Sequence, residues 1–231
     1  MATFFSGGTI WCRMGFVASS VRIAGDKIVE INGAVHPGDE IVDLKGGFLA
    51  PAFMDGHAHP LFGGREAQGP LVNGLQSVEE MVAEVKRFAV ANPNTPWIVG
   101  GAYEAAVIAG GDFLATWLDE AVSDRPVVLQ AVDHHTIWVN SKSLEIAGIT
   151  AESKDPDGGT IARNPDGTAR GTLREPSAMD LIMKHAAERT LEDDVAAIAW
   201  ASDRYLESGV TAATDAWVEP GMAEAYIAAD K

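Results

Sequence analysis

Alternation of apolar and polar residues marks the N-terminal part of the chain as a series of short strands. Residues with branched β-carbons are frequent in these segments, and Gly, Asp and Asn separate them, as is typical of strands joined by tight turns. The predicted strands cover residues 9–12, 16–23, 27–31 and 40–44. We therefore expect a small β-domain at residues 1–48.

A helical period replaces this alternation further along the chain. Ser77 and Glu80 have the spacing of a capping box, which predicts a helix that ends near Asn92. Predicted strands at residues 96–101 and 126–132 flank a short predicted helix at residues 113–122. Strands and helices in alternation predict an α/β fold, either a βα barrel or a doubly wound sheet.

The last third of the chain continues the pattern after an interruption. The pattern at residues 139–149 predicts a capped helix that ends at a glycine. The polar, turn-rich segment at about residues 150–170 predicts an insertion with a small hairpin. A long helix at residues 190–208, a strand at 209–215 and a helix at 220–229 follow. The predicted buried face of the long helix carries Leu191, Val195, Ile198, Ser202 and Tyr205.

Composition narrows the possible partners. With 33 acidic and 17 basic residues, the chain has a formal net charge of -16, which repels polyanions, so we expect no nucleic acid and no acidic membrane surface as a partner. No segment approaches the about 18 consecutive apolar residues of a membrane helix. The single cysteine, Cys12, and the absence of a signal-peptide pattern predict a cytoplasmic protein.

The segment at residues 49–62, LAPAFMDGHAHPLF, carries the clearest candidate for chemistry. In a strand, residues two apart point to the same face, so the imidazoles of His57 and His59 would project together from the strand end. Neutral imidazole nitrogen is a ligand for zinc and similar ions. The alternative is a chance pair of histidines on a solvated loop.

This segment resembles the PGF-[IM]-D-x-H-x-H element that opens the barrel of the amidohydrolase superfamily, with Ala52 where that family usually has Gly. Further motifs follow in the order found in its YtcJ-type branch. They are Asp133-x-His135, Trp138-Val139-Asn140-Ser141, Asp157-Gly158-Gly159, Gly171-x-Leu173-x-Glu175 and Gly209-Val210-Thr211 with Asp215-Ala216.

The resemblance implies a (β/α)8 TIM barrel of the metal-dependent hydrolase type, preceded by part of a small β-sandwich. It implies hydrolysis of an amide-like C–N bond in a small-molecule substrate by a metal-activated water, with one or two divalent ions, zinc being expected. The general base, an Asp after the eighth strand, is expected beyond Lys231. Residues 1–48 would be the sandwich portion and residues 49–231 the first half of the barrel.

Length supports the expectation of an incomplete barrel. A TIM barrel takes about 250 residues, and the pattern predicts four barrel strands, at Met54, Ile98, Val128 and Val210. We expect a fragment, a truncated product or one of two chains, inactive alone, that forms a homo-oligomer or binds a chain supplying the missing strands. The alternative is a non-catalytic half-barrel that serves in binding or assembly, since open sheet edges favour pairing.

The resemblance assigns His57, His59 and Glu175 as metal ligands, with Glu175 spanning two ions. The alternative for Glu175 is a surface carboxylate paired with Arg174 or Arg170.

Substrate-binding candidates are His135, Trp97 and Tyr103. Each has a structural alternative: a hydrogen bond to a neighbouring loop for His135, and core packing for the two aromatic residues. Asp55 is expected to orient the His-x-His strand from behind the metal ligands. Asp215 is expected to be structural.

Overall fold

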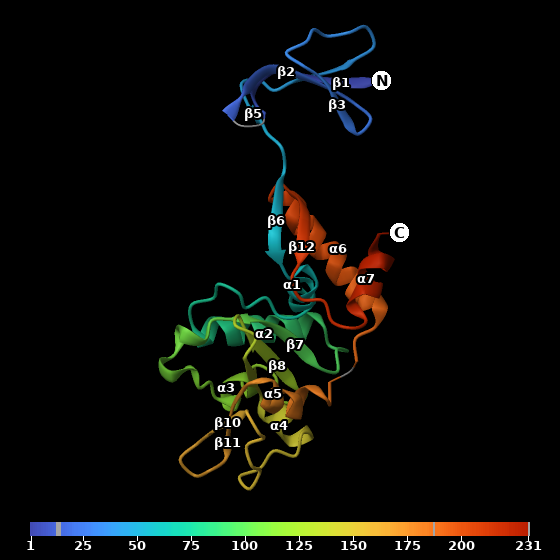
Figure 1. The fold of residues 1–231 in the computed structure, drawn as a ribbon. Helices are drawn as coiled ribbons and strands as arrows, with labels where there is room; N and C mark the ends of the chain where they lie inside the picture. The colour runs from blue at the N-terminus through green and yellow to red at the C-terminus, as the bar shows by residue number, and fades with distance from the viewer. Residues whose placement is uncertain (13–14, 187, 231) are drawn as a thin grey trace. The chain divides into compact units, whose positions relative to one another are not determined.

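A computed structural model describes residues 1–12, 15–186 and 188–230, and Figure 1 shows the order of the elements. The chain divides into two compact units. The first contains Met1–Asp55 with Glu207–Ala213, and the second contains Gly56–Leu206 with Thr214–Lys231. The predicted domain boundary at residue 48 stays a prediction.

The first unit contains a five-stranded sheet. Its strands are β1 (Ala2–Trp11), β2 (Val17–Ala24), β3 (Lys27–Ile31), β4 (Glu40–Asp43) and β5 (Phe48–Leu49). The order is β3-β2-β1-β4, with β5 also paired to β1. The four predicted strands are confirmed. β1 starts earlier than predicted, because its pairing is irregular between Ser6 and Ile10 and this disturbs the alternation. Completion of this sheet to a β-sandwich stays a prediction.

The second unit is built on a mixed sheet. Its strands are β7 (Ile98–Tyr103), β8 (Val127–Ala131), β9 (Thr136–Val139), β10 (Thr160–Arg163) and β11 (Ala169–Arg174). Their order is β10-β11-β9-β8-β7. Only β7 and β8 are parallel, and the other neighbours are antiparallel.

This topology corrects the predicted count of four barrel strands. β7 and β8 lie in the mixed sheet, whereas β6 (Phe53–Ala58) pairs with β12 (Val210–Asp215) in a separate two-stranded sheet. The chain reverses after β8 in a turn where His134 has φ 59. Residues other than glycine seldom adopt this conformation, so the sequence does not predict the turn. A closed barrel is not present among the residues that the structure describes.

Helices cover the mixed sheet. They are α2 (Val78–Ala91), α3 (Ala115–Asp119), α4 (Ser141–Ile146) and α5 (Pro176–Met183), with the short 3-10 turns η2 (Ala105–Val107) and η3 (Ala109–Gly111). The predicted α2 is confirmed at both ends, since the Ser77 side chain accepts from the Glu80 N–H and Asn92 is the C-cap. β9 and α5 were not predicted.

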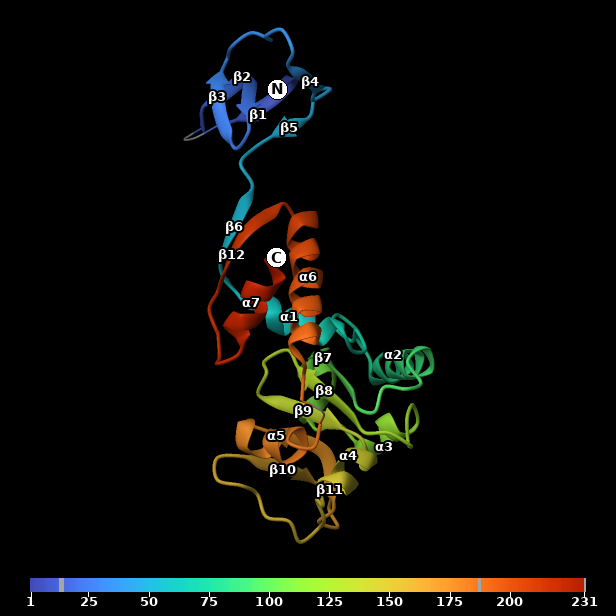
Figure 2. The same ribbon diagram turned by 90° about the vertical axis from the view of Figure 1, so that its right-hand side faces the viewer.

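Three further helices pack together in the second unit: α1 (Pro60–Ala67), α6 (Leu191–Glu207) and α7 (Met222–Ala229). Figure 2 shows α6 and α7 side by side, with α1 beside the lower end of α6. Their shared core consists of Leu61, Ala197, Ile198, Met222 and Ala225.

The predicted buried face of α6 is wrong in part. Leu191 is 53% exposed and Ser202 is also exposed, whereas Ala197 and Ala201 are buried beside Ile198. The distance between packed helices depends on the side chains at their contact, and here small residues face α1. A search for large apolar residues therefore selects the wrong side of α6.

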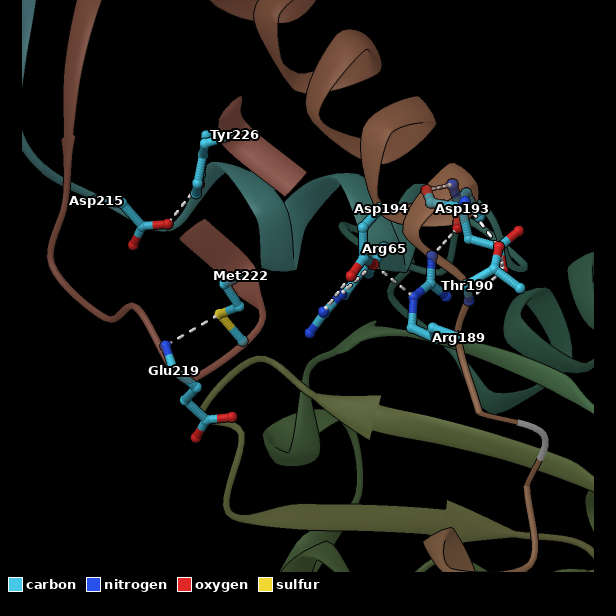
Figure 3. Close-up of polar contacts among 10 residues, drawn as sticks. Arg65, Arg189, Thr190, Asp193, Asp194, Asp215, Glu219, Met222 and Tyr226 are labelled. Carbon is cyan, nitrogen blue, oxygen red and sulfur yellow. Dashed lines mark hydrogen bonds and ion pairs between the residues drawn. The ribbon is translucent and has the colours of Figure 1, made fainter. Parts of the chain in front are cut away.

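An ion-pair network joins the start of α6 to α1 (Figure 3). Asp194 accepts hydrogen bonds from Nε and Nη2 of Arg65 at 2.8 and 2.7 Å, and from Nε of Arg189 at 3.0 Å. The Asp194 side chain is only 12% exposed. Hydrogen bonds from the two guanidinium groups lower the pKa of Asp194, so the carboxylate stays ionised between these two elements.

Candidate metal centre

His57 and His59 lie at the carboxyl end of β6. β6 ends at Ala58, and His59 is the N-cap of α1, which begins at Pro60. The two imidazole rings have centroids 5.3 Å apart and planes at 82°. The chain thus brings the two predicted ligands together by a strand end followed at once by a helix start.

Asp215 ends β12, the strand paired with β6, and its carboxylate contacts His59. Oδ1 of Asp215 lies 3.4 Å from Nδ1 of His59 and accepts the Trp217 N–H at 3.0 Å. Oδ2 accepts from the Tyr226 hydroxyl at 2.5 Å, and Figure 3 shows these two side chains pointing toward one another. The sequence left Asp215 as structural. Its place at the carboxyl end of a strand that the sequence predicts is the signal that could have identified it.

Aromatic rings surround His59. Phe62 and Trp217 have ring centroids 6.1 and 6.4 Å from the His59 ring and 5.6 Å from each other. The His134 ring also contacts Phe62, at 5.9 Å between centroids. These edge-to-face contacts restrict the orientation of the His59 ring.

Glu175 lies beside His135 rather than beside the two histidines of β6. Its Oε2 is 3.0 Å from Nδ1 of His135, and its N–H donates to the His135 carbonyl at 2.7 Å. The hydrogen bond to Glu175 raises the pKa of His135. The Glu175 side chain is 51% exposed, as the surface alternative expects, but its partner is His135. Arg174 binds the Asp112 carboxylate at 2.6 Å and Arg170 donates to the Asp112 carbonyl at 3.1 Å.

The remaining predicted site residues have different surroundings. Tyr103 is fully buried against the rings of Phe113 and Trp138, which is the core alternative that the sequence left open. Trp97 is half-buried and lines a surface hollow of about 450 Å³. Asp55 is half-buried within β6, and its orienting role stays a prediction.

The chemistry of the donors fits a metal ion in part. Two adjacent imidazoles suit a divalent ion, and a carboxylate on the second nitrogen of a ligating histidine is the usual partner of such a ligand. Among the described residues, no group of three or more His, Cys, Asp or Glu side chains is placed to hold a metal. His57, His59 and Glu175 therefore do not form such a group here, and the three-ligand set stays a prediction.

A half-buried acid, Glu66, lies near this cluster, on α1. The Glu66 side chain is 20% exposed, and its Oε1 lies 3.5 Å from Nε2 of His134. This oxygen accepts no hydrogen bond from the residues that the structure describes. Burial raises the pKa of Glu66 to about 7, because few groups replace the water that would stabilise the anion.

This raised pKa gives an expected pH dependence. The folded protein holds the Glu66 proton more tightly than the unfolded chain does, so the free energy of unfolding should fall as the pH rises from 4.5 to about 7. Glu66→Gln should remove about 1–3 kcal/mol of this fall. Urea unfolding of both proteins at pH 5 and pH 8 measures the difference. The same change in the free energy of unfolding between pH 5 and pH 8 in the wild type and in Glu66→Gln would contradict the expectation.

A family comparison covers most of the chain. A model described as the amidohydrolase family matches residues 40–229. The chain belongs to the amidohydrolase family. The identification made from the His-x-His element and the motifs that follow it is confirmed.

Relatives of this amidohydrolase chain have varied names. It is 32% identical over 186 residues to the putative amidohydrolase YtcJ of Bacillus subtilis, covering 79% of this chain and 32% of YtcJ. It is 30% identical to the Arabidopsis thaliana protein LONG AFTER FAR-RED 3, over 86% of this chain and 35% of that protein. It is 28% identical to N-substituted formamide deformylase of Arthrobacter pascens, over 92% and 42% of the two chains.

Solved structures share the fold of this chain. The fold resembles an uncharacterized metal-dependent hydrolase of Pyrococcus furiosus with a TM-score of 0.68 and 22% identity, covering 99% of this chain and 47% of that one. A Pyrococcus horikoshii hydrolase, also described as metal-dependent, gives 0.65 and 25%, covering 99% and 45%. The amidohydrolase chain thus spans less than half the length of these three relatives and two solved structures.

Proposed function

We propose that the chain carries the first metal-ligating segment of a metal-dependent amidohydrolase that cleaves an amide-like C–N bond in a small molecule. The observation that supports this most is the contact of three side chains at adjoining strand ends. His57 and His59 lie together at the carboxyl end of β6, and Asp215 at the end of β12 faces His59. Functional groups of a TIM barrel lie at these carboxyl ends.

His57 and His59 would hold a divalent ion, for which we propose zinc. When bound, such an ion lowers the pKa of water and polarises the substrate carbonyl. Phe62 and Trp217 stand beside His59 and would limit the access of bulk water to it. Glu175 as a third ligand would have to exchange its hydrogen bond with His135 for the metal.

We further propose that the general base and the remaining ligands come from strands outside these 231 residues. Such strands would complete a (β/α)8 barrel and belong either to the same polypeptide or to a second chain. The longer relatives support this, since the chain covers 32% to 42% of their length.

A second candidate is the non-catalytic assembly module. Phe53 and Met54 on β6 are 70% and 68% exposed, and apolar side chains on a short sheet favour association. The module would associate with a second copy or another chain through β6, without binding a metal.

Metal binding separates the two candidates. Purified chain is separated by size, and zinc bound to each fraction is measured by elemental analysis and by equilibrium dialysis. We expect His57→Ala and His59→Ala to weaken zinc binding by more than about 100-fold, which exceeds the usual effect of losing an outer partner. His185→Ala, which changes an exposed histidine of the same unit, is the control. Wild-type zinc content in both variants would contradict the metal assignment, and a metal-free, associated wild type would favour the module.

A further inference from the structure

We propose that Asp215 and Tyr226 are positioning residues that fix the tautomer of His59, so that its Nε2 is the nitrogen available to a metal. This rests on the proposed function, because it assumes that His59 is a ligand. The residues come from three elements: His59 caps α1, Asp215 ends β12 and Tyr226 lies on α7.

The carboxylate of Asp215 is held in one orientation. Its side chain is 8% exposed, and donors occupy both oxygens. Trp217 donates its N–H to Oδ1 at 3.0 Å and the Tyr226 hydroxyl donates to Oδ2 at 2.5 Å. The remaining lone pair of Oδ1 can therefore be directed at Nδ1 of His59, 3.4 Å away.

The contact selects one tautomer of His59. A neutral imidazole carries a single N–H, and an ionised carboxylate can only accept a hydrogen bond. The proton of His59 must then lie on Nδ1, which leaves the lone pair on Nε2. A ligating histidine whose other nitrogen donates to a carboxylate has a fixed ring and a more basic ligand nitrogen.

Packing supports this arrangement both at the His59 ring and between the helices that carry His59 and Tyr226. The His59 ring meets Phe62 and Trp217 edge to face, which limits its rotation. Leu61 of α1 and the α7 residues Met222 and Ala225 belong to one buried cluster, so the helices that carry His59 and Tyr226 have a common core. The three groups are thus positioned before any metal binds.

Nitrogen-15 NMR of the metal-free protein tests the tautomer directly. Protein labelled at histidine is compared with Asp215→Ala, Asp215→Asn and Tyr226→Phe. In the wild type, His59 should show a protonated Nδ1 and an unprotonated Nε2. Asp215→Ala should shift the proton toward Nε2. Asp215→Asn should keep the wild-type tautomer, because the Trp217 N–H holds the amide oxygen where Oδ1 was.

Zinc affinity gives a second readout. Asp215→Ala should weaken zinc binding by about 10–100-fold, as loss of an outer hydrogen-bond partner does. Tyr226→Phe keeps the ring and removes only the hydroxyl, so its loss should lie between the wild type and Asp215→Ala. Asp124→Ala, a change at a carboxylate that is 80% exposed, is the control and should bind zinc as the wild type does.

The outcomes separate this proposal from the proposed function. The same His59 tautomer in the wild type and in Asp215→Ala, with folded protein by circular dichroism, would overturn the positioning role even if His59→Ala loses zinc. If Asp215→Ala does not fold, the same test is read from Tyr226→Phe, where unchanged zinc affinity would overturn the proposal. If His59→Ala keeps its zinc while the tautomer depends on Asp215, the ligand assignment is wrong instead.

Discussion

Asn140→Ala is expected to lower the free energy of unfolding of the second unit by about 3–5 kcal/mol. The side chain of Asn140 has no exposed surface. Its oxygen accepts the Val127 N–H at 3.0 Å, and the Ser143 N–H and hydroxyl at 3.0 and 2.9 Å. Its amide group donates to the carbonyls of Val122 and Arg125 at 2.9 and 2.8 Å.

These contacts explain why the loss should be large. Asn140 caps α4 and at the same time ties β8 to the segment that precedes it, so one truncation leaves several buried polar groups without partners. Each such group costs about 1–3 kcal/mol. The costs of the separate unpaired groups do not add in full, because these groups relax toward one another or toward water.

Two companion variants identify the cause. Asn140→Asp keeps the volume but turns an oxygen toward two carbonyls, so it should destabilise at least as much as Asn140→Ala. Asn94→Ala changes an exposed asparagine and should alter the free energy of unfolding by less than about 0.5 kcal/mol. Urea unfolding followed by circular dichroism measures all three. Asn140→Asp at wild-type stability would show that the two hydrogen bonds donated by the Asn140 amide group do not contribute to the loss.

Local sequence signals predicted individual helices and strands better than they predicted which strands pair in a sheet. The capping box at Ser77 gave α2 its start, and the apolar run at residues 126–132 gave β8, because these signals act within one element. The sheet that β8 joins depends on the turn at His134 and on the short β9. Buried strands of a barrel and of a mixed sheet have the same local pattern, so the barrel prediction failed for β7 and β8.

The candidate site shows the same limit. His57 and His59 are two residues apart, and their contact follows from the strand period. His59 and Asp215 are separated by 156 positions, and Tyr226 lies on a helix whose packing the sequence does not specify. The pairing of β6 with β12 brings Asp215 beside His59. Contacts that depend on such pairing require the structure.

Gly64→Ala is expected to lower the free energy of unfolding by about 3 kcal/mol, at the upper end of overpacking effects. Gly64 lies in α1 where the helix crosses α6, and an added Cβ would come within 2.0 Å of the Ala197 carbonyl oxygen and 2.5 Å of its carbon. Backbone atoms cannot move aside as a side chain can, so the two helices would have to separate.

Gly63 provides a matched control one position earlier on the same helix. A Cβ at Gly63 would meet nothing within 4 Å, so Gly63→Ala should stabilise the protein by about 0.5–1 kcal/mol through the better helix propensity of alanine. Thermal and urea unfolding of both variants measure the difference, which should reach about 3.5–4 kcal/mol. Equal effects at the two positions would mean that α1 and α6 are not in close contact.

The Gly64 variant also bears on the metal centre. His59 is the N-cap of α1 and Tyr226 lies on α7, and both helices share the buried cluster with α6. Displacing α1 from α6 should move the His59 ring away from the Asp215 carboxylate, since His59 is the N-cap of α1. Zinc affinity should then fall in Gly64→Ala and stay at the wild-type value in Gly63→Ala. Unchanged affinity in a destabilised Gly64→Ala would show that the His59–Asp215 contact is held by the paired strands β6 and β12 and does not depend on the packing of α1 against α6.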